Sequence, residues 1–504
     1  MLKQISQTFP RHQLRRLSTI SSGGFTLNLP KLEPSSDAEL ISQILITNHN
    51  PFHFMESSLQ LNGISLSPHL INQTLLRLRH NSKIALAFFQ YSRSLPSTSP
   101  LTSFNLIIDI LGKVRQFDVV RQLIVEMEQP SPETFLILVK RLIAAGLTRQ
   151  AVRAFDDAPC FLQNRFSVVE FGFVLDTLCK YGYTKMAVGV FNERKDEFGC
   201  DEKIYTILIS GWCKLRRIDM AEKFLAEMIE LGIEPNVVTY NVLLNGICRT
   251  ASLFPEERFE RNVRNAEKVF DEMRERGIEP DVTSFSIVLH MYSRAHKSEL
   301  SLDKLKLMKS KGISPTIETY TSVVKCLCSC GRLEEAEELL ETMVDTGISP
   351  SSATYNCFFK EYKGRKDANG AMNLYRKMKN GLCKPSTQTY NVLLGTFINL
   401  GKMEIVKEIW DDLKGTETGP DLDSYTSLVH GLCSKEKWKE ACGYFVEMIE
   451  KGFLPQKLTF ETLYKGLIQS DKLRTWRRLK KKLDEESITF GSEFQRYPFE
   501  PYKR

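Results

Sequence analysis

A proline recurs along the chain at a spacing that indicates a repeat architecture. It closes a Gly-Ile-X-Pro segment or a variant of one, and five of its six intervals are 35 residues while the first is 45. The positions are Pro235, Pro280, Pro315, Pro350, Pro385, Pro420 and Pro455. An ordinary multidomain protein has no reason to show such a period, so the array itself is the fold.

Each period contains two amphipathic helices. The first helix begins near an aromatic residue that opens an apolar stripe at i, i+3, i+4, i+7 and i+8, which places the stripe on one face. A second stripe follows, as in Ala221, Phe224, Leu225 and Met228. The first stripe is read eleven times, from Phe104, Phe135, Phe171, Tyr205, Tyr240, Phe285, Tyr320, Tyr355, Tyr390, Tyr425 and Phe460. The repeating unit is therefore a pair of helices.

Small residues and turn residues specify how these helices join and stack. Gly211, Gly246 and Gly431 lie within first helices, where a missing side chain lets paired backbones approach closely. The Gly of the Gly-Ile-X-Pro segment is a left-handed cap of the second helix, and the Pro prevents its continuation. One helix pair cannot bury its stripes alone, whereas stacked pairs can. The sequence therefore predicts an all-α, right-handed superhelical solenoid of helix-turn-helix repeats, whose first helices line the concave groove.

One period is longer than the others, and its ten extra residues lie between Cys248 and Ala266. We expect residues 249–265 to lengthen the turn between two helices without disturbing either helix. A tolerated surface loop is the favoured interpretation over an interaction role for Phe254 to Glu257.

The first thirty residues have the composition of an organelle import sequence. They contain no acidic residue and four basic residues, so four of the +7 net charges lie here and charge is weak evidence for a polyanionic partner. Their apolar and basic residues recur at roughly helical spacing, as in transit peptides and not in secretory signals. Arg16, Leu17 and Ser18 followed by small hydroxyl residues resemble a mitochondrial processing site. We expect residues 1–30 to be a mitochondrial transit peptide rather than a merely basic tail, with the chloroplast as the alternative destination.

A 35-residue helix pair with text such as VVTYNVLLNGIC at residues 237–248 closely resembles the pentatricopeptide repeat family. The resemblance covers residues 101–456 as ten repeats, which start at 101, 132, 168, 202, 237, 282, 317, 352, 387 and 422. Residues 31–100, above all Leu75 to Tyr91, look like the family's N-terminal helical cap. Residues 457–504 form a partial repeat followed by a basic C-terminal capping helix and tail.

The resemblance implies binding of single-stranded organellar RNA, one nucleotide per repeat, in support of transcript end stabilisation, processing, splicing or translation. In the family the reading pair is the fifth residue of a repeat and the residue just before the next repeat. Short polar side chains suit this task because they carry donors and acceptors with little rotamer entropy. Other RNA-processing proteins are the further partners that the resemblance suggests. A peptide-binding tetratricopeptide scaffold is the alternative, but its Trp-x-x-Leu-Gly-x-x-Tyr signature is missing.

Carried over one repeat at a time, the pairs predict part of an RNA sequence. Asn with Ser implies C in the repeats that start at 101 and 352, Thr with Asn implies A at 202, and Asn with Asp implies U at 237 and 387. Leu136, Gly172 and Ser286 are atypical, and the repeat at 317 leans only towards a purine. Because the family binds RNA parallel to the protein, C, A, U, C and U fall at places one, four, five, eight and nine from the 5′ end. The predicted base-reading residues are Asn105, Ser131, Thr206, Asn236, Asn241, Asp281, Thr321, Ser351, Asn356, Ser386, Asn391, Asp421 and Thr426.

Two further sets of residues match RNA contacts of the family less completely. Val169 and Val238 match the second residue of a repeat, which stacks between bases, whereas most other repeats depart from Val there. The basic run after the last full repeat is equally consistent with a soluble capping helix and with phosphate binding. Its candidate phosphate contacts are Arg474, Arg477, Arg478 and Lys481.

The sequence predicts no cofactor, no metal and no catalytic role. Cysteines two residues apart on one helix, such as Cys326 and Cys328, point away from each other, so a zinc site is not expected. A zinc-deaminase signature, a phosphate loop and a nucleophile elbow are all missing, which leaves a nuclease with dispersed carboxylates as a remote third reading. No run approaches the roughly 18 uninterrupted apolar residues of a membrane-spanning helix. Five cysteines share one inward position and are expected in the core: Cys179, Cys213, Cys248, Cys328 and Cys433.

Overall fold

The computed structural model describes residues 27, 29–48, 66–94, 101–162, 166–251, 256–381 and 383–485. Across these ranges the secondary structure consists of α-helices and one short 3-10 helix, η1 (Ala158–Cys160), with no strand. The predicted transit peptide lies outside the described residues except for positions 27, 29 and 30. The chain divides into two compact units, residues 1–280 and 281–504.

The first unit holds an N-terminal helix and a series of helix pairs. Its helices are α2 (Ser36–Asn48), α4 (Pro68–Arg77), α5 (Ser82–Ser94), α6 (Leu101–Lys113), α7 (Phe117–Val125), α8 (Pro132–Ala144), α9 (Thr148–Asp157), α10 (Val168–Lys180), α11 (Thr184–Phe198), α12 (Glu202–Lys214), α13 (Ile218–Glu230), α14 (Val237–Ala251) and α15 (Glu256–Glu275).

The second unit continues with helix pairs of the same kind. Its helices are α16 (Val282–Ala295), α17 (Ser298–Ser310), α18 (Ile317–Ser329), α19 (Leu333–Asp345), α20 (Ser352–Arg365), α21 (Ala368–Asn380), α22 (Thr387–Asn399), α23 (Met403–Lys414), α24 (Leu422–Ser434), α25 (Trp438–Glu450), α26 (Lys457–Gln469) and α27 (Leu473–Glu485).

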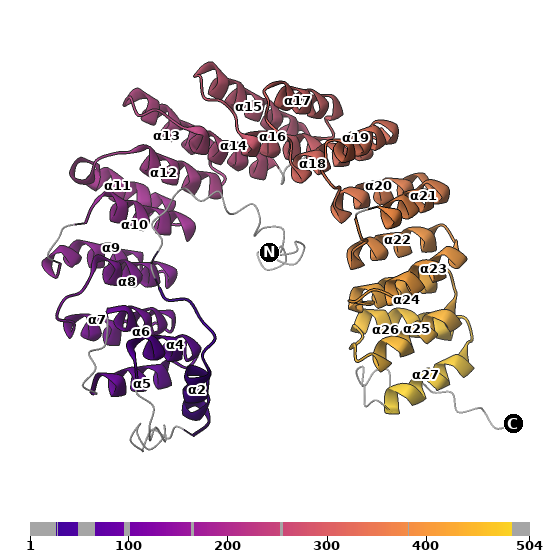
Figure 1. Cartoon of the computed structure of the whole chain (residues 1–504), viewed down its shortest axis with the longest axis horizontal. Helices are drawn as coiled ribbons and strands as arrows, with labels where there is room; N and C mark the ends of the chain where they lie inside the picture. Colours follow the sequence, from indigo (N-terminus) through magenta and orange to yellow (C-terminus); the bar gives the residue numbers. More distant parts are fainter. Residues whose placement is uncertain are drawn as a thin grey trace. The chain divides into compact units, whose positions relative to one another are not determined.

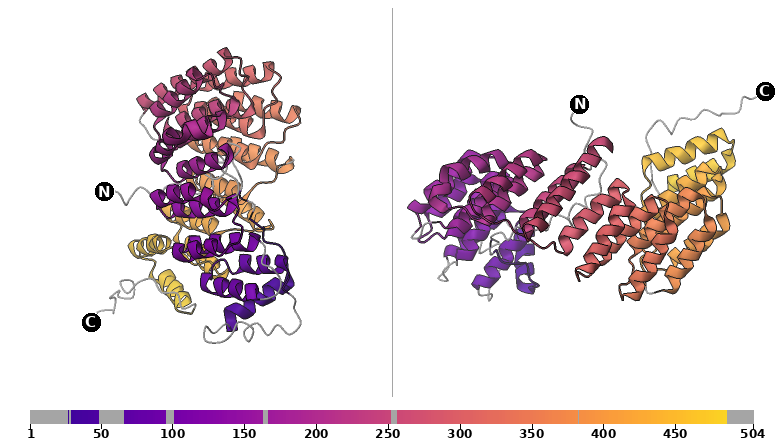
Figure 2. Two further views of the ribbon diagram at one scale, coloured as in Figure 1. Left: turned by 90° about the vertical axis from the view of Figure 1, so that its left-hand side faces the viewer. Right: turned by 90° about the horizontal axis from the view of Figure 1, so that it is seen from above.

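Within each unit the helices form two layers. Each first helix packs against the first helix of the next repeat, from α4 through α6, α8, α10 and α12 to α14, and from α16 through α18, α20, α22 and α24 to α26. Each second helix packs against its own first helix, so the second helices form the other layer (Figures 1 and 2). The eleven predicted first helices are all present, and each starts at a predicted repeat start or, for α26, at residue 457.

The aromatic residue near the start of each first helix anchors the core of its repeat. Tyr205, Tyr240 and Tyr425 are almost completely buried between the two helices. Their hydroxyls still find partners, because Tyr205 donates to Glu227 at 3.0 Å and Tyr425 donates to Glu447 at 3.2 Å. The large ring is thus buried while its hydroxyl keeps a hydrogen bond, which explains why Tyr suits this position.

The Gly-Ile-X-Pro segment ends the second helix as predicted. The glycines at five of these turns have φ between 74° and 81°, a left-handed conformation that other residues adopt only with strain. At the first of these turns Gly232 N donates to Ile229 O and Ile233 N to Met228 O, each at 3.0 Å, which satisfies the last carbonyls of the helix. The glycines are Gly232, Gly277, Gly312, Gly347 and Gly452.

The expectation of a loop at residues 249–265 is wrong. Helix α14 continues to Ala251, and α15 already starts at Glu256 and runs for 20 residues, whereas most second helices have 13 or fewer. The segment after Pro255 has no helix breaker, alternates acidic and basic residues at helical spacing, and buries Val263. The insertion therefore lengthens a helix. Phe254 and Pro255 lie outside the described residues.

The hairpin α4–α5 continues the stack towards the N-terminus. Ser67 caps α4 by accepting a hydrogen bond from Leu70 N, and Phe88 and Phe89 of α5 are completely buried. Helix α2 also packs on α4. Within its described residues, 31–48 and 66–94, the region expected as a cap thus contains one helix pair resembling a repeat and one further helix.

Glycines in the first helices receive a side chain from the preceding repeat. A Cβ on Gly431 would lie 2.7 Å from Cγ2 of Ile398, and a Cβ on Gly211 would lie 2.5 Å from Sγ of Cys179. In both pairs the glycine is the tenth residue of its repeat and its neighbour is the twelfth residue of the repeat before. Close approach of the first helices therefore depends on a missing side chain at this point.

We predict opposite effects for two glycines of one repeat. Gly431→Ala should lower the free energy of unfolding by about 1–3 kcal/mol, because its methyl group would collide with Ile398. Gly443→Ala is the matched control, since its Cβ would meet no atom within 4 Å on α25. That variant should be stabilised by about 0.5–1 kcal/mol. Urea unfolding of both variants measures the difference, and equal effects would refute the packing account.

Candidate nucleic-acid interface

In the nine repeats that start at 132 to 422, the residue just before the repeat caps its first helix. Its side chain accepts a hydrogen bond from a backbone N–H two or three positions further on, which satisfies a donor that the helix itself leaves free. The pairs are Ser131 with Thr134, Ser167 with Val169, Asp201 with Ile204, Asn236 with Thr239, Asp281 with Ser284, Thr316 with Thr319, Ser351 with Thr354, Ser386 with Thr389, and Asp421 with Ser424.

This capping role is missing from the sequence analysis, although Ser, Thr, Asp and Asn are the best N-cap residues. Helix capping alone therefore accounts for the residue types at this position. Gln456 stands out, because it precedes α26 without making a side-chain cap. The signal was available in the sequence: a cap residue followed three positions later by Thr or Ser recurs in most repeats.

The fifth residue of a repeat faces the third residue of the next repeat. Thr134 donates to Oδ1 of Asn105 at 2.8 Å, so this amide is tied to the following first helix. The hydroxyls of Thr206 and Thr239 lie 2.7 Å apart, as do those of Thr321 and Thr354. Several predicted base-reading side chains thus lie at the seam between consecutive first helices and already have a protein partner.

In one repeat of the second unit the structure brings both predicted reading residues together. Nδ2 of Asn391 donates to Oδ1 of Asp421 at 3.5 Å. Burial raises the pKa of Asp421, but hydrogen bonds from Ser424 and Asn391 outweigh it and hold the pKa below its usual range. The carboxylate is therefore ionised at neutral pH and acts as an acceptor between a helix N-terminus and the seam.

Three fifth residues differ from the rest, because they hold an oxygen without a partner. Oδ1 of Asn356, Oδ1 of Asn391 and Oγ1 of Thr426 are inaccessible to solvent and accept or donate no hydrogen bond. They belong to three consecutive repeats of the second unit. Buried polar atoms are rarely left in this state.

The remaining predicted positions have varied surroundings. Asn241 is buried in the first unit and Asp281 belongs to the second unit. The atypical fifth residues are structural: Leu136 is completely buried, Ser286 bonds to the Val282 carbonyl of its own helix, and Gly172 lies against Ile207.

The candidate stacking residues are accessible. Val169 is 50% exposed, and Val238 is half-buried. Leu458 occupies the same second position in the partial repeat and is 64% exposed. Sequence reasoning overlooked Leu458 because only Val was sought at this position.

Basic residues recur at the thirteenth position of the first helix, another feature that the sequence analysis missed. All five are exposed, and the first two pair with an aspartate one turn earlier: Lys113 with Asp109 at 2.8 Å, and Lys180 with Asp176 at 2.5 Å. They could have been found from the sequence, because all five lie at the same distance from the start of their repeats. The residues are Lys113, Lys180, Lys214, Arg249 and Arg294.

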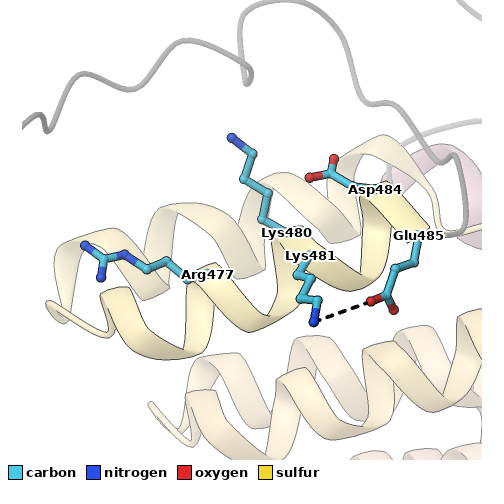
Figure 3. A pocket seen from close by; sticks show the side chains of 5 residues that line it. All are labelled: Arg477, Lys480, Lys481, Asp484 and Glu485. Carbon is cyan, nitrogen blue, oxygen red and sulfur yellow. Dashed lines mark ion pairs between the residues drawn. The ribbon is translucent and has the colours of Figure 1, made fainter.

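Helix α27 presents a basic face beside a shallow hollow. Leu479 and Leu483 point into the protein, while the candidate phosphate contacts all lie on the exposed side. Arg477, Lys480 and Lys481 line the hollow together with two acidic residues, and Lys481 pairs with Glu485 at 3.9 Å (Figure 3). The candidate phosphate contacts are Arg474, Arg477, Arg478 and Lys481.

The cysteines behave as core residues. Of the five at the shared inward position, four are buried and Cys248 is half-buried. Burial raises the pKa of Cys179 and of Cys213 to about 12, so both thiols stay protonated at neutral pH. Among the described residues no three His, Cys, Asp or Glu side chains gather as metal ligands would. No described helix is both long and apolar enough to cross a membrane.

Two models of known protein families match the chain. One, described as the PPR repeat family, matches residues 200–249, 315–364, 351–399 and 420–469. The other, described as a pentatricopeptide repeat domain, matches residues 260–294 and 268–329.

The chain is also similar to individual proteins and solved structures. A pentatricopeptide repeat-containing protein of Arabidopsis thaliana, named as mitochondrial, is 91% identical over 507 residues and covers 100% of both chains. A second Arabidopsis thaliana protein of this name is 32% identical over 214 residues, 41% of this chain and 33% of its own. The solved structure of maize PPR10 is 18% identical, covers 92% of this chain and 75% of its own, and has a TM-score of 0.37. Yeast Rmd9p, solved with a 16-nucleotide target RNA, is 11% identical over 91% and 97% of the two chains, with a TM-score of 0.42.

The capping role predicts a stability effect that is independent of any ligand. Ser351→Ala should lower the free energy of unfolding by about 0.5–2 kcal/mol, because Thr354 N loses its acceptor. Gln456→Ala at the equivalent position should change it by less than about 0.5 kcal/mol, since Gln456 makes no side-chain cap. Thermal or urea unfolding without RNA compares the two variants. An equally large loss for Gln456→Ala would show that the cap is not the cause.

Proposed function

The chain belongs to the pentatricopeptide repeat family, and we propose that it binds single-stranded RNA in the mitochondrion, with about one nucleotide per repeat. Membership follows from the relative that is 91% identical over the full length of both chains. The observation that carries the proposal is the row of short polar side chains at the fifth position. They come from first helices, and within each unit they lie at successive seams of the layer that the first helices form.

The seam geometry supports base reading in physical terms. A base that enters between two repeats meets the fifth side chain of one repeat and the cap side chain of the next, as Asn391 and Asp421 lie within 3.5 Å of each other. Amide, hydroxyl and carboxylate groups there offer both donors and acceptors to the edge of an unstacked base. Exposed basic residues at the thirteenth position and on α27 supply a sequence-independent attraction for phosphates.

The predicted target keeps the base assignments of the repeats. C is read at the repeats starting at 101 and 352, A at 202, and U at 237 and 387. The residue just before the next repeat must also cap a helix, so its type varies little. The fifth residue therefore carries more of the discrimination between bases. Val169 and Val238 stack against bases, and Leu458 extends this contact into the partial repeat.

The mitochondrial location rests on two independent supports. Residues 1–30 have the composition of a transit peptide. The relative that is 91% identical is named as mitochondrial. The protein would then act on an organellar transcript by end protection, splicing, processing or translation, by binding rather than by chemistry of its own.

A change of base preference tests the proposal directly. The double variant with Asn391→Thr and Asp421→Asn should prefer A over U at the ninth place of the RNA, because it converts the U-reading pair into the A-reading pair. Asn is as good an N-cap as Asp, so α24 keeps its cap. Binding is measured on two RNAs that differ only at this place.

The equivalent change at a second site serves as a control. Asn241→Thr with Asp281→Asn should move the preference at the fifth place and leave the ninth place unaffected. Binding of the unaltered protein to neither RNA above a salt-sensitive background would refute the function. Tight binding of peptides instead would favour the scaffold alternative.

A further inference from the structure

The oxygens without partners single out one part of the array. We propose that RNA binding is anchored on the three consecutive repeats that start at 352, 387 and 422, where the fifth residue holds a buried oxygen that only the ligand can satisfy. This inference rests on the proposed function. It further specifies which repeats dominate the affinity for RNA and which chemical groups of the RNA these repeats require.

The unsatisfied atoms are Oδ1 of Asn356, Oδ1 of Asn391 and Oγ1 of Thr426. Asn356 is only 7% exposed, so water does not replace the missing donor easily. A buried acceptor without a donor destabilises the free protein. A ligand that supplies the donor removes this penalty on binding, whereas a ligand at an already satisfied position does not.

The contrast with other repeats lies in the contact to the next first helix. In three other repeats the fifth residue bonds to the hydroxyl of the third residue of the next repeat, as in Asn105 with Thr134 and Thr206 with Thr239. That hydroxyl also contacts its own cap residue, Ser131 for Thr134 and Ser351 for Thr354, so capping does not prevent the bond. In the three anchor repeats the oxygen of the fifth residue lacks this bond.

Making these oxygens available requires little rearrangement. The terminal torsion of an Asn side chain is broad and roughly two-fold, so its oxygen turns towards an entering base without leaving a favoured rotamer. No protein hydrogen bond to the oxygen breaks in the process, and the turn gives up only the 3.5 Å contact of Nδ2 with Asp421 at Asn391. At Asn105 the same turn breaks the bond to Thr134, and at Thr206 a base competes with the Thr239 hydroxyl. The lost protein bond offsets most of the free energy gained from the base.

The free atoms also define the chemistry of the ligand. An amide oxygen accepts, so the base at each Asn must present an N–H on its Watson–Crick edge. The exocyclic amine of cytosine does so at Asn356, and N3–H of uracil does so at Asn391. The hydroxyl of Thr426 accepts or donates and therefore selects less strictly. The anchor thus takes three consecutive nucleotides whose first two are C and U.

Two matched pairs of variants test this proposal. Thr426→Val and Thr206→Val remove the same hydroxyl from the fifth position, with and without a protein partner. Asn356→Leu and Asn105→Leu do the same for the amide. The probe is a single-stranded RNA with C, A, U, C and U at places one, four, five, eight and nine.

Thr426→Val and Asn356→Leu should each weaken RNA binding about tenfold or more, because the base loses the oxygen of the fifth residue, which no protein group occupies. Thr206→Val and Asn105→Leu should weaken it about threefold or less. In the free protein the order should reverse. The urea midpoint should stay or rise for Thr426→Val and Asn356→Leu, and fall for Thr206→Val and Asn105→Leu.

Equal losses of affinity within each pair, or a falling urea midpoint for Thr426→Val and Asn356→Leu, would overturn the anchor. These outcomes leave the proposed function intact, because the unaltered protein still binds the probe. Failure of the unaltered protein to bind would refute the proposed function itself.

Discussion

Contact between successive first helices is the interaction on which the rest of this protein depends. Each helix pair buries its apolar stripes only when the next pair covers them, so every repeat needs its neighbour. The approach is close enough that one partner must be small. Gly431 receives Ile398, while in another pair the roles are exchanged and Gly112 receives Arg141. Because this contact fixes the spacing of the first helices, it also fixes the spacing of the polar residues at their seams.

In the proposed function, the seam serves stability and base recognition with the same atoms. Asp421 caps α24, accepts from Asn391 and remains ionised, so one carboxylate links a helix end, a neighbouring repeat and the candidate reading surface. A residue that must cap a helix is restricted to Ser, Thr, Asp and Asn. The residues available for the proposed base recognition at the cap position are therefore the few that can also cap a helix.

Much of the architecture was predictable because repetition averages out local uncertainty. A stripe read once is ambiguous, but eleven stripes in one register place the helix starts at residues such as Leu101 and Leu422, where the structure has them. The buried aromatics and most of the shared cysteines followed from the same register. The insertion before Ala266 has no second copy to compare with. Its residues form the start of α15, although the period alone suggested a loop.

The candidate site was predictable only as a list of positions. The resemblance identified Asn105 and Asn356 as equivalent, yet Asn105 bonds to Thr134 while Oδ1 of Asn356 has no partner. That difference arises from packing across repeats, which the sequence of one repeat does not contain. The capping role can be read from the sequence, because in most repeats a cap residue is followed three positions later by Thr or Ser.

The most direct test of the central claim is to sequence the RNA crosslinked to this protein inside mitochondria. The account predicts footprints of about one nucleotide per repeat that share C at the first place, A and U at the fourth and fifth, and C and U at the eighth and ninth. The strongest constraint should fall on the last C and U. Footprints without a shared sequence, or recovery of no RNA above the level of an unrelated mitochondrial protein, would contradict it.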